Sequence, residues 1–167
     1  ERVYEKAIDA LIYLHKLPSP PSIDLPRYDD AMLLKESNCF IDWYVSVLNG
    51  ETLSKNRREE FNLIFKHLLS LSKVFGEVIV LRDYHADNLI WLNDKIAFRK
   101  VGMLDFQDAV IGSPIYDLVS LLEDARRDVS PALADKMIKR YLKAFPTYTR
   151  KDFNVAYAIL GIQRNLK

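Results

Sequence analysis

Cysteine is almost absent from this chain, since Cys39 is the only one among its 167 residues. A lone cysteine excludes an internal disulfide framework and is typical of proteins from a reducing cytosol. The amino-terminal segment is charged and amphipathic, which is unlike a secretory signal. We therefore expect a cytoplasmic protein.

Long apolar runs and a large excess of one charge are also missing. No apolar stretch approaches the roughly 20 residues that a transmembrane helix needs. The formal net charge of +1 gives no argument for binding to nucleic acid or to a membrane surface. A basic run at Lys55–Arg58 is followed at once by Glu59 and Glu60, which is typical of a solvated helix start. We expect neither nucleic acid nor a membrane as a partner.

The residues that are present fit one domain, 1–167, with 49% hydrophobic residues to form a core. Prolines at positions 18, 20, 21 and 26 predict a non-helical linker. Apolar periodicity and helix-start signals predict helices over 2–17, 28–48, 56–73, 114–127, 131–144 and from 149 to the end, with strands near 77–82, 89–92 and 98–104. The start signals are Ser113-Pro114, Ser130-Pro131 and a capping box at Thr149–Asp152. This pattern predicts an α+β fold that is mainly helical with a small β element.

The most informative segment is Leu81–Asn88, which follows an apolar, strand-like run. It places Asp83 five residues before Asn88, and a second apolar run then ends at Asp105. Asp, Asn and Asp in this order, on a loop and then at a strand end, are the arrangement by which kinases position a hydroxyl and hold magnesium on ATP. Carboxylate and amide oxygens are hard ligands suited to Mg²⁺.

The motif departs from the protein-kinase pattern His-Arg-Asp-x-x-x-x-Asn, because Leu81 replaces the leading His and Gln107 replaces the Gly of Asp-Phe-Gly. It resembles instead the aminoglycoside phosphotransferase-like small-molecule kinases. The matching residues are Asp83-x-His85-x-x-Asn88, Leu104-Asp105-Phe106 and Tyr116-Asp117-Leu118. The stretch Met103–Val129 looks most like the cell-wall-recycling kinases, which phosphorylate the anomeric hydroxyl of N-acetylmuramate and N-acetylglucosamine. The specific resemblance spans about residues 77–129.

The resemblance implies a protein-kinase-like C-terminal lobe. Such a protein uses ATP and Mg²⁺ to move the γ-phosphate to a hydroxyl of a small-molecule acceptor, here expected to be an amino sugar. Other acceptors are an aminoglycoside or a choline- or homoserine-type alcohol. A hypothesis from a different class is a non-catalytic, pseudokinase-like binding module. The intact Asp83, Asn88 and Asp105 argue against it.

The resemblance also implies a partner within the same protein, an N-terminal lobe with a Gly-rich phosphate-covering loop and a strand lysine. Only five glycines occur, and no Gly-rich loop precedes Asp83. We therefore expect this chain to be the C-terminal lobe, truncated at both ends, and to have no kinase activity alone.

We expect Asp83 to act as the catalytic base. The loose transition state of phosphoryl transfer demands little proton abstraction, so its main task could be to orient the hydroxyl. Asn88 and Asp105 are the expected Mg²⁺ ligands and contact the ATP phosphates through the metal. Each of these three residues has a simpler interpretation. Asp83 is then a surface-loop Asp, Asn88 a turn residue and Asp105 a cap at a strand end. Their joint spacing favours the kinase interpretation.

Three further side chains surround this motif. The resemblance implies that His85 supports the catalytic loop and that Asp117 accepts backbone N–H groups from it. For Asp117 the alternative is a first-turn helix carboxylate. A dinuclear metallophosphoesterase would also begin with Asp83-x-His85, but it needs more histidines than His15 and His67 supply. Arg82 either pairs with a carboxylate or is solvated.

The aromatic helix before the motif is a candidate substrate wall. In kinases of this type, helices inserted before the catalytic loop line the acceptor site, and aromatic rings stack on sugar faces. The residues concerned are Glu36, Asp42, Trp43 and Tyr44. Packing between helices is the simpler interpretation.

Overall fold

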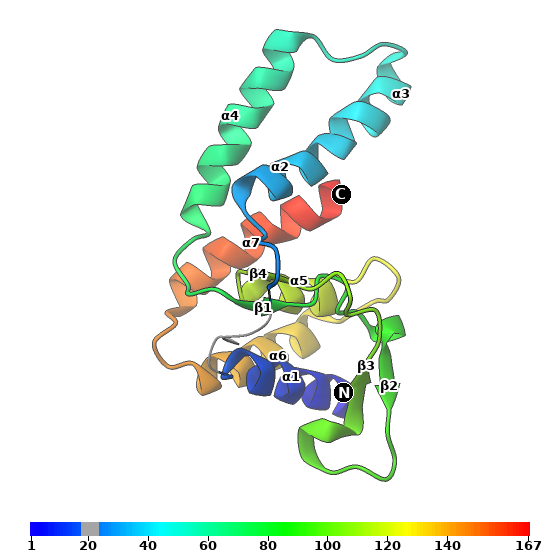
Figure 1. The fold of residues 1–167 in the computed structure, drawn as a ribbon, viewed down its shortest axis with the longest axis vertical. Helices are drawn as coiled ribbons and strands as arrows, with labels where there is room; N and C mark the ends of the chain where they lie inside the picture. The colour runs from blue at the N-terminus through cyan, green and yellow to red at the C-terminus, as the bar shows by residue number, and fades with distance from the viewer. Residues whose placement is uncertain (18–23) are drawn as a thin grey trace.

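The computed structural model describes residues 1–17 and 24–167, and it is mainly helical (Figure 1). Its helices are α1 (Arg2–His15), α2 (Asp30–Cys39), the π-helix η1 (Phe40–Val45), α3 (Ser46–Asn49), α4 (Lys55–Leu71), the 3₁₀ helices η2 (Ala86–Asn88) and η3 (Ala97–Lys100), α5 (Ile115–Leu122), α6 (Pro131–Ala144) and α7 (Arg150–Leu166). Its strands are β1 (Val78–Val80), β2 (Leu89–Trp91), β3 (Val101–Met103) and β4 (Val110–Gly112). The prolines at 18, 20 and 21 lie outside the described residues, and Pro26 is non-helical as expected.

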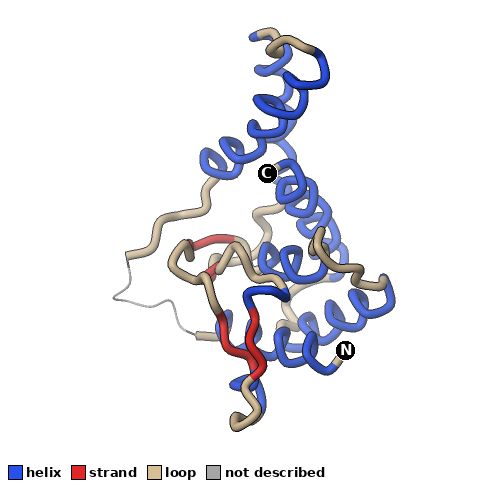
Figure 2. The backbone as a smooth tube through the Cα atoms, turned by 90° about the vertical axis from the view of Figure 1, so that its right-hand side faces the viewer, coloured by secondary structure: helices blue, strands red, loops and turns tan. Residues whose placement is uncertain are grey.

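The strands form two antiparallel pairs, β1 with β4 and β2 with β3. Loop 81–88 runs from the first pair to the second, and loop 104–109 returns from the second pair to the first. The N–H of Leu104 donates to the carbonyl of Asn88 at 2.9 Å, which joins the two loops. Figure 2 shows the two sheets close together, and the β2–β3 hairpin packs against α1 through β3 and the η3 turn between its strands. This topology brings Asp83, Asn88 and Asp105 into one region.

Helix α5 lies in the core, and every one of its residues is buried. A helix that is apolar on almost all sides is typical of a protein interior. It packs against α7, while α1 packs against α6 and against η3. Tyr116, Leu118 and Phe153 are among the fully buried side chains, and each such burial stabilises the fold by about 1.5–3 kcal/mol. In the described part of the chain, no helix is long and apolar enough to cross a membrane.

Residues 30–71 form an arm that extends away from the rest of the molecule (Figure 1). One leg is the continuous run of α2, η1 and α3, and the other is α4. In the wider turn of the π-helix, Ser46 Oγ donates to the carbonyl of Ile41, five residues earlier, at 3.0 Å. Gly50 ends this leg with φ 70°, a left-handed cap that glycine adopts without strain. The expected helix 28–48 is therefore confirmed in place but begins at Asp30.

Helix α5 is shorter than expected, because it ends at Leu122 and not near Arg127. Asp124 explains the difference. Its Oδ1 accepts a hydrogen bond from the backbone N–H of Arg126 at 3.1 Å, and such a side-chain turn competes with helix. At the other end Pro114 occupies the N-cap position, so the prediction of proline at the first helical position was wrong by one residue.

Two other helix starts are confirmed. Ser130 Oγ accepts the N–H of Leu133, and Thr149 Oγ1 accepts the N–H of Asp152. The strand predicted over 98–104 was wrong in its first half, which is the 3₁₀ helix η3. Strand β4 was not predicted, because three residues are too few to show a periodicity.

His15 is buried where α1 packs against α6. Its Nδ1 lies 2.7 Å from Oη of Tyr141, and its Nε2 has no hydrogen-bond partner among the described residues. Burial lowers the pKa of His15 from 6.5 to about 3, because the charged ring would lose its water without gaining a partner. Between these two pH values the folded protein holds a neutral ring while the unfolded chain holds a charged one.

Acidification is therefore expected to destabilise the fold through His15. The folded pKa lies below the unfolded one, so stability that is present above pH 6.5 is lost as the pH falls toward 3. The loss is about 1.4 kcal/mol per pH unit, or about 2 kcal/mol between pH 7 and pH 5. Denaturant unfolding of the wild type and His15→Gln at both pH values measures it, because only the wild type has this titration. His67→Gln, at an exposed position of α4, is the control and should follow the wild type. Parallel losses in the wild type and His15→Gln would exclude His15 as the cause.

Candidate active site

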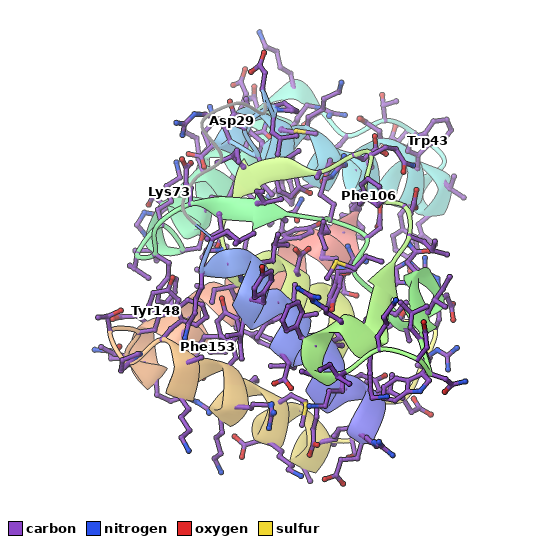
Figure 3. All side chains as sticks on the ribbon, turned by 60° about the horizontal axis from the view of Figure 1, so that its bottom comes forward. Asp29, Trp43, Lys73, Phe106, Tyr148 and Phe153 are labelled. Carbon is purple, nitrogen blue, oxygen red and sulfur yellow. The ribbon has the colours of Figure 1, made fainter. Side chains whose placement is uncertain are left out.

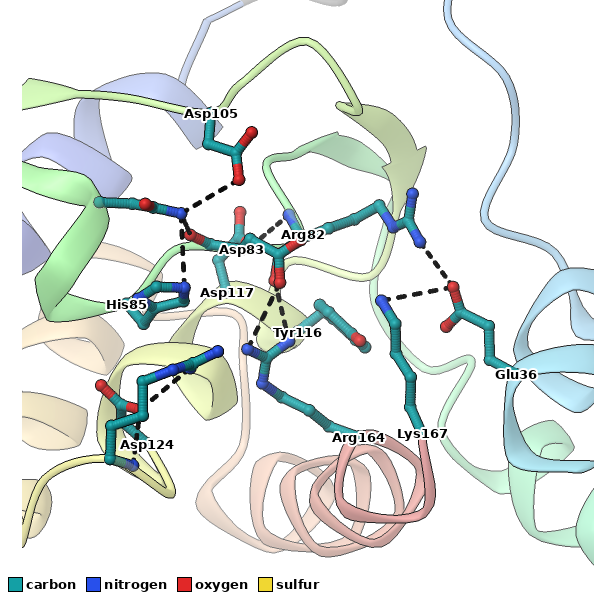
Figure 4. A network of polar contacts seen from close by, with 12 residues as sticks. Glu36, Arg82, Asp83, His85, Asp105, Tyr116, Asp117, Asp124, Arg164 and Lys167 are labelled. Atoms are coloured by element: carbon teal, nitrogen blue, oxygen red, sulfur yellow. Dashed lines mark hydrogen bonds and ion pairs between the residues drawn. The ribbon is translucent and has the colours of Figure 1, made fainter. Parts of the chain in front are cut away.

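Asp117 holds the beginning of the candidate catalytic loop, residues 81–88. Its side chain enters from α5 with no exposed surface. Its Oδ2 accepts the N–H of Leu81 at 2.8 Å, and its Oδ1 accepts the N–H of Arg82 at 3.0 Å (Figure 4). Burial raises the pKa of Asp117 to about 7, while these N–H donors and the nearby Arg164 act in the opposite direction. This geometry differs from a solvated first-turn carboxylate.

Asp117→Ala is expected to lower the free energy of unfolding by about 1–3 kcal/mol, because two buried N–H groups lose their acceptor. Activity should fall as well, since the loop that carries Asp83 loses an anchor. Denaturant unfolding measures the first effect. Asp94→Ala, at an exposed carboxylate of the β2–β3 hairpin, is the matched control and should change stability by less than about 0.5 kcal/mol. An unchanged melting temperature for Asp117→Ala would contradict the anchoring role.

Two residues of the site have left-handed backbone conformations. Arg82 has φ 67° and Asp105 has φ 57°. A non-glycine residue in this region costs of order 1–3 kcal/mol and persists only where its surroundings impose it. Such strain gathers at functional sites, where it fixes the direction of a side chain. Here it occurs immediately before Asp83 and at Asp105 itself.

Asn88 links the backbone of Asp83 to the carboxylate of Asp105. Its Nδ2 donates to the carbonyl of Asp83 at 3.0 Å and lies 3.4 Å from Oδ2 of Asp105. Because the amide nitrogen makes these contacts, the amide oxygen is the Asn88 atom available as a metal ligand. The Asp105 carboxylate is exposed and accepts a hydrogen bond from Gln107 Nε2.

The side-chain oxygens of Asn88 and Asp105 fit a magnesium ion bound together with a nucleotide. Magnesium is usually held by one or two protein carboxylates, with phosphate and water oxygens completing six ligands. The described residues contain no group of three His, Cys, Asp or Glu side chains that could hold a metal alone. Asn88 and Asp105 therefore suit a metal that needs phosphate oxygens, and the dinuclear metallophosphoesterase interpretation finds no support.

The side chain of His85, within the loop, is buried. Its Nε2 lies 3.4 Å from Nδ2 of Asn88, while its Nδ1 has no partner among the described residues. The other two histidines lie on α1 and α4, away from the loop in the chain. The His85 ring therefore contacts the Asn88 side chain from the buried side of the loop.

Arg82 is paired and largely buried. Its Nη2 lies 2.6 Å from Oε1 of Glu36, and the two side chains are 15% and 13% exposed. Glu36 also accepts a hydrogen bond from Tyr28 Oη, and Lys167 Nζ lies 3.4 Å from it. Of the two alternatives for Arg82, pairing with a carboxylate or solvation, the structure shows the ion pair. Glu36 connects the arm to the catalytic loop (Figure 4).

The other candidate wall residues lie farther along the arm. Asp42 pairs with Arg58, and the Tyr44 ring stacks on Phe40 with centroids 5.3 Å apart. Trp43 is 75% exposed, so packing between helices does not account for it. Figure 3 shows Trp43 projecting at the outer edge of the molecule.

Arg164, near the end of α7, was not predicted as a site residue. One of its nitrogens donates to the carbonyl of Arg82 at 3.0 Å, and another lies 3.7 Å from Oδ1 of Asp83. It stands outside every motif, in a helix whose pattern is that of ordinary amphipathic packing. The sequence held no signal for it.

Comparison with known proteins identifies relatives of this chain. The model of the family described as "Phosphotransferase enzyme family" matches residues 1–153. The chain is similar to the N-acetylmuramate/N-acetylglucosamine kinase of Caulobacter vibrioides, with 36% identity over 95% of this chain and 46% of the relative. It is also similar to the protein of that name from Pseudomonas aeruginosa, with 33% identity over 100% of this chain and 49% of the relative. The chain thus spans about half the length of these curated relatives.

Solved structures of lower identity share the fold. An aminoglycoside phosphotransferase from Streptomyces rimosus, solved with ADP and streptomycin, has a TM-score of 0.58 at 18% identity and covers 96% of this chain and 61% of its own. A choline/ethanolamine kinase family protein from Mesorhizobium loti has a TM-score of 0.58 at 13% identity and covers 98% and 52%. At such identities the likeness shows the fold alone. It confirms the expected protein-kinase-like architecture.

Proposed function

The chain belongs to the phosphotransferase enzyme family, and we propose that it is part of a kinase that transfers the γ-phosphate of ATP to a hydroxyl of an amino sugar. The observation that carries this proposal is the arrangement of three side chains from two loops. Asn88 lies between Asp83 and Asp105 and contacts the backbone of one and the carboxylate of the other.

Each residue of this set has one task in the proposed reaction. Asp83, 36% exposed, faces the acceptor, orients its hydroxyl and accepts its proton. Asn88 and Asp105 hold Mg²⁺ through their side-chain oxygens. The bound metal supplies charge neutralisation for the phosphate oxygens. Asp117 and His85 keep the loop in place and do not touch the reacting atoms.

The names of the relatives support an amino sugar as the acceptor. The curated relatives are N-acetylmuramate/N-acetylglucosamine kinases. We propose that the arm forms one wall of the acceptor site, where the exposed rings of Trp43 and Tyr44 offer apolar faces to a sugar.

We also propose that an N-terminal lobe of the same protein docks beside the metal site. A largely apolar hollow of about 780 Å³ lies next to Phe106, between α1 and the strands β1 and β3. Phe106 itself is 62% exposed. An apolar surface of this kind is typical of a face that another part of a protein covers, and a second lobe would clamp the phosphates from the opposite side.

The test is a kinase assay on the full-length protein with Mg²⁺-ATP and four separate acceptors: N-acetylmuramate, N-acetylglucosamine, streptomycin and choline. Turnover of the two amino sugars alone is the expected result. Turnover of streptomycin or choline alone would replace the acceptor class. Absence of turnover with every acceptor, together with Mg²⁺-ATP binding, would favour a non-catalytic binding module. Residues 1–167 alone are expected to turn over none of them.

A further inference from the structure

Arg164 makes contacts that none of the roles above uses. Its side chain is only 14% exposed, and its guanidinium lies over the ring of Tyr116 at 5.7 Å from the ring centroid. From there one nitrogen donates to the carbonyl of Arg82 and another faces the Asp83 carboxylate (Figure 4). The planar guanidinium presents several donors in a rigid fork, so one side chain can serve both groups.

The Arg82 carbonyl belongs to the peptide bond that precedes Asp83. The rest of this stretch is already held, because Asp117 accepts the N–H groups of Leu81 and Arg82, and Glu36 pairs with the Arg82 side chain. Arg82 adopts φ 67°, so its peptide bonds would relax if their partners were removed. Among the described residues, Arg164 is the donor to this carbonyl.

Arg164 is itself fixed from the neighbouring position of α7. The Gln163 side chain is fully buried, and its Nε2 donates to the carbonyl of Leu33 at 3.2 Å and to Glu36 Oε2 at 3.3 Å. Helix α7 also packs along α5, which carries Asp117. The guanidinium therefore reaches the loop from a rigid helix, which positions side chains more accurately than a loop does.

We propose that Arg164 is a positioning residue that fixes the peptide bond before Asp83 and so aims the Asp83 carboxylate at the acceptor hydroxyl. The inference rests on the proposed kinase function and deepens it. If the orienting carboxylate is displaced by about 1 Å, the reaction rate falls on the order of 100-fold, even when every contact to the bound substrate is kept. Arg164 would act on kcat through Asp83, with little effect on the binding of ATP or acceptor.

The experiment measures steady-state kinetics of full-length wild type, Arg164→Ala, Arg164→Lys, Asp83→Asn and the Arg164→Ala/Asp83→Asn double variant, with both amino sugars. Arg164→Ala is expected to lower kcat about 10- to 100-fold with both KM values within about threefold. Arg164→Lys should recover part of this loss, because an ammonium can replace one of the two contacts. In the Asp83→Asn background the further loss should shrink to less than about threefold, since the residue to be aimed is already inactive.

Arg150→Ala is the matched control, because Arg150 lies on the same helix but pairs with Asp135 at the surface. It should leave kcat unchanged.

The proposal is overturned if Arg164→Ala keeps kcat within twofold, or if its effect is undiminished in the Asp83→Asn background. It is equally overturned if the loss lies in KM for N-acetylmuramate alone, since Arg164 would then bind the acceptor carboxylate. If Arg164→Ala does not fold, Arg164→Lys carries the same comparison. Wild-type inactivity would instead reject the kinase function itself.

Discussion

Asp83→Asn is expected to lower kcat of the full-length enzyme at least about 100-fold, with little change in KM for ATP. The substitution keeps the size of the side chain and removes its ability to accept the acceptor's proton. Nucleotide binding should persist, because Asn88 and Asp105, which hold the metal in the proposed reaction, are untouched. Steady-state kinetics at saturating acceptor, with ATP varied, give both constants.

The control for this prediction is Asp87→Asn in the same loop. Asp87 is exposed and pairs with Arg127 at 2.7 Å, away from the motif contacts. The kcat of the Asp87→Asn enzyme should stay within a few-fold of the wild-type value. Near-normal kcat for Asp83→Asn would show that Asp83 is not the catalytic carboxylate.

Asp105→Ala is expected to abolish Mg²⁺-dependent nucleotide binding while the protein stays folded. Asp105 is the charged member of the Asn88–Asp105 pair, and the remaining amide oxygen is a weak ligand by itself. Asp105→Asn is the sharper companion, because Asn tolerates the left-handed backbone at φ 57° and loses only the charge. Both variants should bind Mg²⁺-ATP at least about 100-fold more weakly than wild type.

Calorimetric titration with ATP in the presence and absence of Mg²⁺ separates metal-dependent binding from the rest. Asp108→Ala, an exposed carboxylate three residues away, is the control and should bind normally. Circular dichroism and thermal unfolding check that each variant is folded. Wild-type affinity for Mg²⁺-ATP in both Asp105 variants would reject its role as a metal ligand.

The helices could be predicted where the signals for them are local. Ser130 and Thr149 cap α6 and α7 as their positions in the sequence indicate, because a cap involves a side chain and an N–H only three residues away. The end of α5 could not be predicted. Residues 123–128 are almost all charged, which suits an exposed helical turn as well as a loop, and the stop depends on the side chain of Asp124 turning back to the backbone.

The sequence by itself determined the fold class and indicated the family to which the motif belongs. Asp83, Asn88 and Asp105 lie within one segment, and two strand–loop units bring them together, so residue type and spacing are enough to indicate a kinase. The family comparison agrees with that interpretation. The substrate wall cannot be derived in this way, because the exposed rings on the arm follow no motif.

The resemblance implied a contact from Asp117 to the loop, but only the tertiary structure decided which other side chains hold the motif in place. Asp117 reaches Leu81 across 36 residues, Glu36 reaches Arg82 across 46, and Arg164 reaches Arg82 across 82. In the sequence, Glu36 is a candidate substrate-wall residue with no sign of its pairing to Arg82, and Arg164 looks like an ordinary charge on an amphipathic helix. Their positions depend on how α2, α5 and α7 pack, and this packing is the joint result of many apolar contacts spread over the chain. The motif is local, so it can be predicted from the sequence, whereas the side chains that hold it come from distant parts of the chain.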